Sequence, residues 1–191
     1  MKTTKQRALA ELYASQALCS PCPFGKQEER HKVFGEGNPD ARLMFIGEAP
    51  GAEEDRLKRP FVGRSGKLLD KIFKQAGFSR EDVFITNIVK CRPPNNRTPT
   101  PEEISPAMKQ LLKQEIAIVR PRIICTLGAV ATQLFFPQPI MMSKVRGKPL
   151  HFAQSHITLI PTFHPAYALR NTDAEKLLVL DIIHAFEDSN K

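Results

Sequence analysis

The fold of this chain is decided by residues 44–55, MFIGEAPGAEED. The apolar run before Gly47 has the length of a buried strand and stops abruptly at that glycine. Gly47 and Gly51 allow the backbone to turn tightly and to come close to a ligand, and Pro50 fixes the turn between them. Because open α/β sheets bind ligands at the carboxyl ends of their strands, this stretch predicts a binding site beside Glu48.

Residues 59–67, RPFVGRSGK, add groups that suit a nucleotide or a nucleic acid. Phe61 offers a ring for stacking on a base, and the Gly, Ser and Arg residues that follow it suit a phosphate. An ordinary loop with a solvated acidic run explains the two stretches equally well when they are taken alone. A P-loop is excluded, because the glycine spacing is wrong and Leu68 stands where that motif needs Ser or Thr.

The composition indicates one soluble globular domain that spans residues 1–191. Hydrophobic residues make up 41% of the chain and charged residues 25%, as in typical globular proteins. A net charge of +8 and a pI near 9.5 favour a polyanionic partner, with nucleic acid ahead of a membrane surface. Since no signal segment or apolar run of membrane-spanning length is found, we expect a cytoplasmic protein without a membrane partner. We also expect it to act as a monomer.

Periodic segments predict an alternation of helices and strands along the chain. The segments are helices at 4–17, 68–76, 106–119, 129–136 and 173–187, and strands at 43–46, 82–87, 122–127, 150–152 and 157–160. The start of the third helix is ambiguous, because Thr100 to Glu103 and Ser105-Pro106 both carry helix-start signals. The alternation predicts a doubly wound α/β sandwich with a mainly parallel sheet.

Three of the predicted strands end in polar side chains. Glu48 and Asn87 follow the first two strands, and His164 follows the last. Because the carboxyl ends of parallel strands meet at one edge of a sheet, these residues are candidates for a common site.

The cysteines are candidates for a metal site. Cys19 and Cys22 form a C-x2-C turn of the kind that zinc and iron–sulfur sites use, although a redox pair or chance spacing stays open. Four cysteines in an intracellular chain favour metal binding or inert thiols over disulfides. Cys125 lies within an apolar strand, which favours an inert core thiol.

Four motifs together resemble the family 4 uracil-DNA glycosylases, the iron–sulfur members of their superfamily. The motifs are GEAPG at 47–51, RPFVG at 59–63, TNIVKCRPP at 86–94 and TFHPA at 162–166. The resemblance runs from Cys19 to the final helix, and it implies a three-layer α/β/α sandwich around a four-stranded, mainly parallel sheet. It also implies a monofunctional enzyme that flips uracil out of DNA and hydrolyses its N-glycosidic bond, which initiates base excision repair.

The resemblance assigns roles to the residues at the strand ends. Phe61 matches the ring that stacks on uracil, and Asn87 matches the amide that reads its N3–H and O4. His164 matches the histidine that faces O2, where charge grows as the bond breaks. In the best-known branch of the superfamily an aspartate at the position of Ala49 orients the water. Family 4 shares the small residue, so Glu48 is the nearest carboxylate, acting as a base or as a field that stabilises the sugar cation.

Further residues match the edges of that pocket. Gly47 lies in the first pocket motif, and Glu54 matches the position thought to exclude the methyl group of thymine. Ser65 resembles a phosphate holder. Leu169 and Arg170 resemble the loop that enters the duplex near the vacated space.

The metal site departs from the family pattern. The family holds a 4Fe–4S cluster with four cysteines, three of which match Cys19, Cys22 and Cys91. The fourth position, sixteen residues after Cys91, is Ala107. We therefore expect a labile or absent cluster, while a rearranged helix start that lets another residue complete the site is the alternative.

Two non-enzymatic functions compete with this interpretation. A protein that captures uracil in DNA without turnover is one, but the related branch that does so uses a histidine in the loop after the second motif. Residues 92–101 contain none. A zinc-stabilised DNA-binding module built on Cys19, Cys22 and Cys91 is the other, and it leaves Phe61 and Asn87 unexplained.

Overall fold

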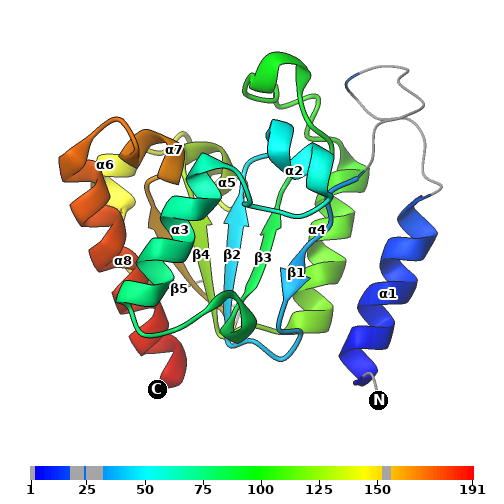
Figure 1. Cartoon of the computed structure of the whole chain (residues 1–191), viewed down its shortest axis with the longest axis horizontal. Coiled ribbons are helices and arrows are strands. Elements are labelled where there is room, and N and C mark those ends of the chain that lie inside the picture. Colours follow the sequence, from blue (N-terminus) through cyan, green and yellow to red (C-terminus); the bar gives the residue numbers. More distant parts are fainter. Residues whose placement is uncertain (1–2, 18–23, 25–31, 152–155) are drawn as a thin grey trace.

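The chain forms an α/β sandwich around one sheet (Figure 1). A computed structural model describes residues 3–17, 24, 32–151 and 156–191. The strand order is β1-β3-β2-β4-β6-β5. The central strands are parallel, and they are β3 (Phe84–Asn87), β2 (Leu43–Gly47), β4 (Ile123–Leu127) and β6 (Thr158–Thr162).

The prediction of a four-stranded sheet gives too few strands. The described chain forms a six-stranded mixed sheet. The four parallel strands are flanked by two short antiparallel strands, β1 (Glu36–Gly37) beside β3 and β5 (Leu150–His151) beside β6. Two-residue strands carry no hydrophobic alternation, so β1 could not be recognised within the turn-rich stretch before β2.

Both faces of the sheet are buried, which explains the continuous apolar run in β2. Leu43 and Phe45 point into one core cluster, and Met44 and Ile46 point into the other. The first cluster is covered by α3 (Arg64–Gln75) and α8 (Thr172–Asn190). The second is covered by three helices, α1 (Thr4–Ala17), α4 (Pro106–Val119) and α5 (Ala129–Gln133). The described chain thus has the three layers that the sequence predicts.

The ambiguous helix start is resolved at Pro106. Ser105 caps α4, and its hydroxyl accepts a hydrogen bond from the Met108 N–H at 3.4 Å. Thr100 and Glu103 make the bonds of a capping box, yet no helix follows them, since Pro106 has no N–H to donate to residue 102. The chain instead turns at 101–104 and begins its helix afresh.

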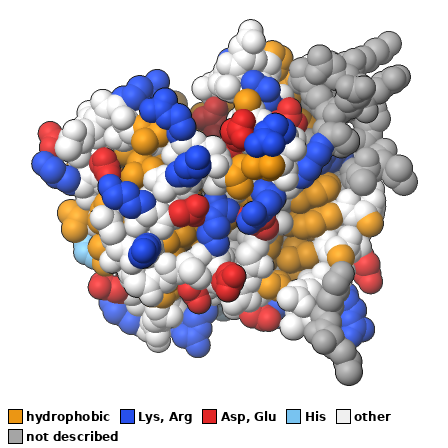
Figure 2. All heavy atoms as spheres, viewed as in Figure 1, with side chains coloured by type: hydrophobic (Ala, Val, Ile, Leu, Met, Phe, Trp, Pro, Cys, Tyr) orange, Lys and Arg blue, Asp and Glu red, His pale blue; other side chains and the backbone are white. Residues whose placement is uncertain are grey.

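Short elements cover the carboxyl ends of the parallel strands, at the top of Figure 1. They include α2 (Ala52–Leu57), which contains the acidic run, and α7 (Pro165–Ala168) after β6. Further short elements are η2 (Pro94–Asn96) and α6 (Met142–Val145), whereas η1 (Arg80–Asp82) lies at the amino end of β3. Over the front of the molecule as viewed in Figure 1, Lys and Arg side chains are interspersed with acidic ones (Figure 2). Among the described helices, none has the length and apolar character needed to cross a membrane.

Candidate functional site

A cavity of about 630 Å³ opens at the carboxyl ends of β2, β3 and β6. Its lining includes the residues that follow the three strands, Glu48, Asn87 and His164, together with Phe61 from the loop after α2. The structure therefore gathers into one pocket side chains that are up to 116 positions apart, from Glu48 to His164.

Gly47 lets the ring and the amide of the pocket lie close to the backbone of β2. A Cβ atom at this position would stand 2.4 Å from Phe61 Cζ and 2.5 Å from Asn87 Oδ1, so any side chain would displace both groups. Asn87 is 2% exposed, and its Oδ1 is the single buried side-chain polar atom without a hydrogen-bond partner in the described part of the chain. A buried carbonyl oxygen without a donor costs about 1–3 kcal/mol, so Asn87 is arranged to receive an N–H from a ligand.

Phe61 and His164 form neighbouring walls of the pocket. Their ring centroids are 6.0 Å apart and the ring planes are inclined by 34°. Gly128, which sequence patterns identify only as a strand terminator, lies behind His164 with φ at +92°. A Cβ atom on Gly128 would stand 2.9 Å from His164 Cβ, so this glycine lets the histidine loop approach β4.

His164 is a neutral imidazole with its proton on Nε2. Its Nδ1 accepts a hydrogen bond from the Ala166 N–H at 3.1 Å, because His164 is the N-cap of α7. Burial lowers the pKa of His164 to about 4, and the negative charge of Glu54 only partly opposes this shift. With Nδ1 used as an acceptor, the neutral ring carries its hydrogen on Nε2, where it can serve as a hydrogen-bond donor.

Glu48 is a half-buried carboxylate beside Ala49 in the cavity lining. Burial raises its pKa, and a hydrogen bond with the side chain of Thr98 partly offsets this effect. Thr98 comes from the loop after η2, and no sequence motif marks it as a site residue.

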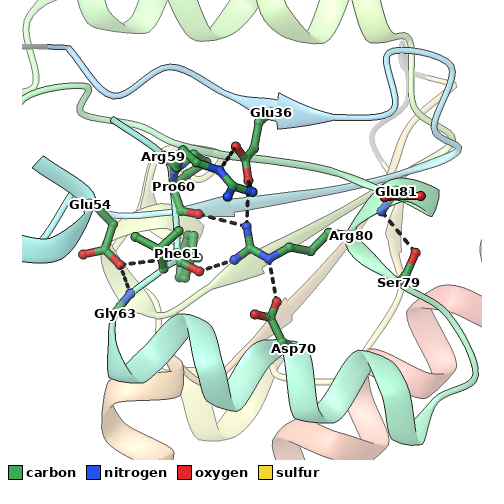
Figure 3. Close-up of polar contacts among 11 residues, drawn as sticks. Glu36, Glu54, Arg59, Pro60, Phe61, Gly63, Asp70, Ser79, Arg80 and Glu81 are labelled. Carbon is green, nitrogen blue, oxygen red and sulfur yellow. Dashed lines mark hydrogen bonds and ion pairs between the residues drawn. The ribbon is translucent and has the colours of Figure 1, made fainter. Parts of the chain in front are cut away.

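Glu54 fixes the loops that shape the pocket. Its Oε1 accepts hydrogen bonds from the N–H groups of Val62 at 2.8 Å and Gly63 at 2.7 Å. Its Oε2 accepts from the Gly51 N–H at 3.2 Å. Figure 3 shows this carboxylate directed at the backbone around Gly63. These contacts give Glu54 a loop-holding role, and exclusion of a methyl group stays a prediction.

The described lining of the cavity carries three cations, Arg64, Arg97 and Arg170, beside the acids Glu48, Glu53 and Glu54. Ser65 lies in the first turn of α3, which begins at Arg64 after a glycine N-cap without a side-chain bond. Both terminal nitrogens of Arg97 donate to Glu103, so Ser65, Arg64 and Arg170 are the lining residues that suit a phosphate. Leu169 is 39% exposed next to Arg170, outside the cavity lining.

The predicted metal ligands are only partly visible. Cys19 and Cys22 lie outside the described residues, whereas Cys91 is buried in the cluster under α4. Ala107 is exposed in the first turn of α4. Cys125 belongs to the cluster on the opposite face of the sheet, and burial raises its pKa well above the ordinary thiol value. Within the described residues no group of three or more His, Cys, Asp or Glu side chains could hold a metal.

A buried ion pair that no local sequence pattern indicates lies beneath the pocket. Lys90 Nζ donates to Glu115 Oε2 at 2.6 Å, to Thr86 Oγ1 at 2.5 Å and to the Asn87 carbonyl at 2.7 Å. The side chains of Lys90 and Glu115 are 2% and 0% exposed. Tyr13 on α1 donates to Glu115 Oε1 at 2.9 Å. This network joins α1 and α4 to the end of β3, where the Asn87 amide faces the cavity.

The fold and the strand-end pocket define the class of the protein. The sequence profile of the Uracil DNA glycosylase superfamily matches residues 34–185, which contain the whole sheet and every described pocket residue. The chain belongs to the uracil DNA glycosylase superfamily.

Curated relatives identify the branch. A type-4 uracil-DNA glycosylase of Thermotoga maritima is 47% identical over 167 residues, which cover 86% of this chain and 85% of the relative. A second, from Sulfurisphaera tokodaii, is 45% identical over 85% of this chain and 76% of its own length. A type-5 uracil-DNA glycosylase of Thermus thermophilus is 34% identical over 53% of this chain and 52% of its own length. Within the superfamily, the chain belongs with the type-4 group, as its motifs predict.

Proposed function

We propose that this chain is a monofunctional uracil-DNA glycosylase that initiates base excision repair. The observation that carries the proposal is the buried Asn87 Oδ1, which has no partner in the described part of the chain and lies beside a ring and a neutral histidine. A flipped uracil supplies the missing N–H at N3, and the Asn87 Nδ2 donates to O4. Cytosine presents the reversed pattern at these positions, so it leaves buried polar groups unpaired and is rejected.

Each pocket residue then has its own role in cleaving the N-glycosidic bond. Phe61 stacks on the base, which contributes about 1–3 kcal/mol. His164 donates from Nε2 to O2, where negative charge accumulates on the departing uracil. Glu48 either activates the water or stabilises the positive sugar by its charge. Ser65 and Arg170 hold the phosphates, and Leu169 enters the space that the base vacates.

We also propose the domain organisation, the oligomeric state, the partner and the compartment of the protein. Residues 1–191 act as a single domain and a monomer, since one sheet carries both core clusters and one chain supplies every group of the mechanism. Uracil-containing DNA is the macromolecular partner, and the cytoplasm is the compartment. A non-catalytic DNA-binding module has no comparable support, because it requires neither the neutral His164 nor the unpaired Asn87 oxygen.

The purified protein should release uracil from a uracil-containing oligonucleotide and leave an abasic site with an intact strand. Asn87 and His164 are the groups opposite the base, and among the described residues that line the cavity there is no lysine to form a Schiff base with the sugar. Gel analysis with and without alkali checks this result, with a thymine-containing oligonucleotide as the control. Strand cleavage without alkali, in protein free of nuclease, would contradict a monofunctional reaction. The rate should also fall steeply with added salt, because phosphate contacts release counterions.

The donor set does not fit a complete four-cysteine cluster, and no catalytic step depends on one. The fourth family position is Ala107, and Cys125 lies across the sheet from Cys91. We propose that Cys19, Cys22 and Cys91 form an incomplete, structural iron–sulfur site that is labile in air.

Iron and sulfide should be present after anaerobic purification and should decline on exposure to air. Ala107→Cys should slow this loss by supplying a fourth thiolate, whereas Lys113→Cys, elsewhere on α4, should not. Chemical analysis of iron and sulfide before and after air makes the measurement. Stoichiometric iron and sulfide that survive air in the wild type and disappear in Cys125→Ser would overturn the proposal.

A further inference from the structure

The stacking ring of the pocket depends on an unusual backbone conformation. Phe61 has φ at +53°, in the left-handed region that residues other than glycine rarely adopt. Gly66 packs against this conformation, because a Cβ atom there would stand 1.8 Å from the Phe61 carbonyl oxygen. Such strain persists at functional sites only where the surrounding structure holds it in place.

Glu54 and Arg80 hold the peptide units on either side of Phe61. On the C-terminal side, Glu54 accepts the N–H groups of Val62 and Gly63, and the guanidinium of Arg80 donates to the Phe61 carbonyl oxygen. On the N-terminal side, Arg80 also donates to the Pro60 carbonyl oxygen at 3.1 Å. Figure 3 shows Arg80 reaching from η1 to this loop, opposite Glu54.

Two carboxylates orient Arg80. Glu36 of β1 accepts from Nη1 at 2.8 Å, and Asp70 of α3 accepts from Nε at 2.5 Å. The Arg80 side chain is 19% exposed, and it shares Glu36 with Arg59, so two cations and two acids meet here. These contacts direct the cation to the loop backbone and away from a DNA phosphate.

We propose that Arg80 is a positioning residue that holds Phe61 in its left-handed conformation, so that the ring forms a wall of the base pocket. The proposal rests on the proposed glycosylase function and deepens it. Four segments separated in sequence (β1, the loop after α2, α3 and η1) meet at this guanidinium. The planar fork of arginine supplies several donors in fixed directions, which a lysine cannot reproduce.

A double-mutant cycle with Phe61 tests the proposal. Arg80→Ala should lower the single-turnover rate of uracil excision by about tenfold to a hundredfold, which matches the strain that the clamp offsets. Phe61→Ala removes the ring, so Arg80→Ala should have almost no further effect in that background. Arg80→Lys keeps the charge and should recover only a small part of the rate. Ile123→Val, at the amino end of β4 and away from the pocket, is the control for a general loss of stability.

A readout independent of activity uses the absence of tryptophan from the chain. In a Phe61→Trp variant, adding Arg80→Ala should shift the fluorescence emission to longer wavelength and increase quenching by acrylamide, because the ring leaves its buried position. If the wild type releases no uracil, the proposed function fails, but the fluorescence still decides whether Arg80 holds the ring. Unchanged fluorescence, additive losses in the cycle, or a wild-type rate for Arg80→Lys would each overturn the proposal.

Discussion

Replacing His164 with alanine is expected to lower the single-turnover rate of uracil excision by about 10²–10³, the usual loss for one donor to a developing anion. The structure fixes the donor, since Nδ1 accepts from the Ala166 N–H and leaves the proton on Nε2. The rate is measured with enzyme in excess over a uracil-containing oligonucleotide. His184→Ala, an exposed histidine on α8, is the matched control and should retain the wild-type rate. A His164→Ala rate near that of the wild type would refute the assigned role.

The lowered pKa of His164 also predicts how stability depends on pH. The folded-state value is about 4, below the ordinary 6.5. As the pH falls below 6.5, His164 binds a proton in the unfolded chain but stays neutral in the folded chain. The free energy of unfolding therefore decreases until the pH reaches about 4. The difference in melting temperature between pH 7 and pH 4.5 should therefore be smaller in His164→Ala than in His184→Ala.

Breaking the buried ion pair should produce the largest loss of stability. Lys90→Met leaves the Glu115 carboxylate buried without its cation, which costs about 3–5 kcal/mol in the free energy of unfolding. Denaturant-induced unfolding measures this loss. Lys71→Met, which breaks an exposed ion pair with Glu175, is the control and should change stability by less than about 1 kcal/mol.

A second variant separates the buried charge from the shape of the side chains. Lys90→Met combined with Glu115→Leu removes both charges, so most of the lost stability should return. The Asn87 carbonyl still lacks its donor in this variant, because Lys90 Nζ is its hydrogen-bond partner. Uracil excision should therefore recover less than stability does. A loss below about 1 kcal/mol in Lys90→Met alone would show that the pair is not energetically important.

The local pattern of the sequence determined the long helices, the parallel strands and the strand-end positions of the pocket residues. The apolar run in β2 and the capping and proline signals around Pro106 depend on residues that are neighbours along the chain, so periodicity could identify them. The four motifs identified the family, and the strand-end placement of Glu48, Asn87 and His164 followed from parallel strands that end at one edge.

Only the tertiary structure revealed what supports these residues. Glu115 lies 25 positions from Lys90, and Arg80 lies 19 positions from Phe61, so no local pattern links them. Gly128 approaches His164 because two strands are adjacent in the sheet. The edge strand β1 likewise exists through its pairing with β3 and not through its own two residues, whereas β5 falls within the strand predicted at 150–152. Periodicity reports the face on which a side chain lies, whereas the partner on that face depends on how distant segments pack.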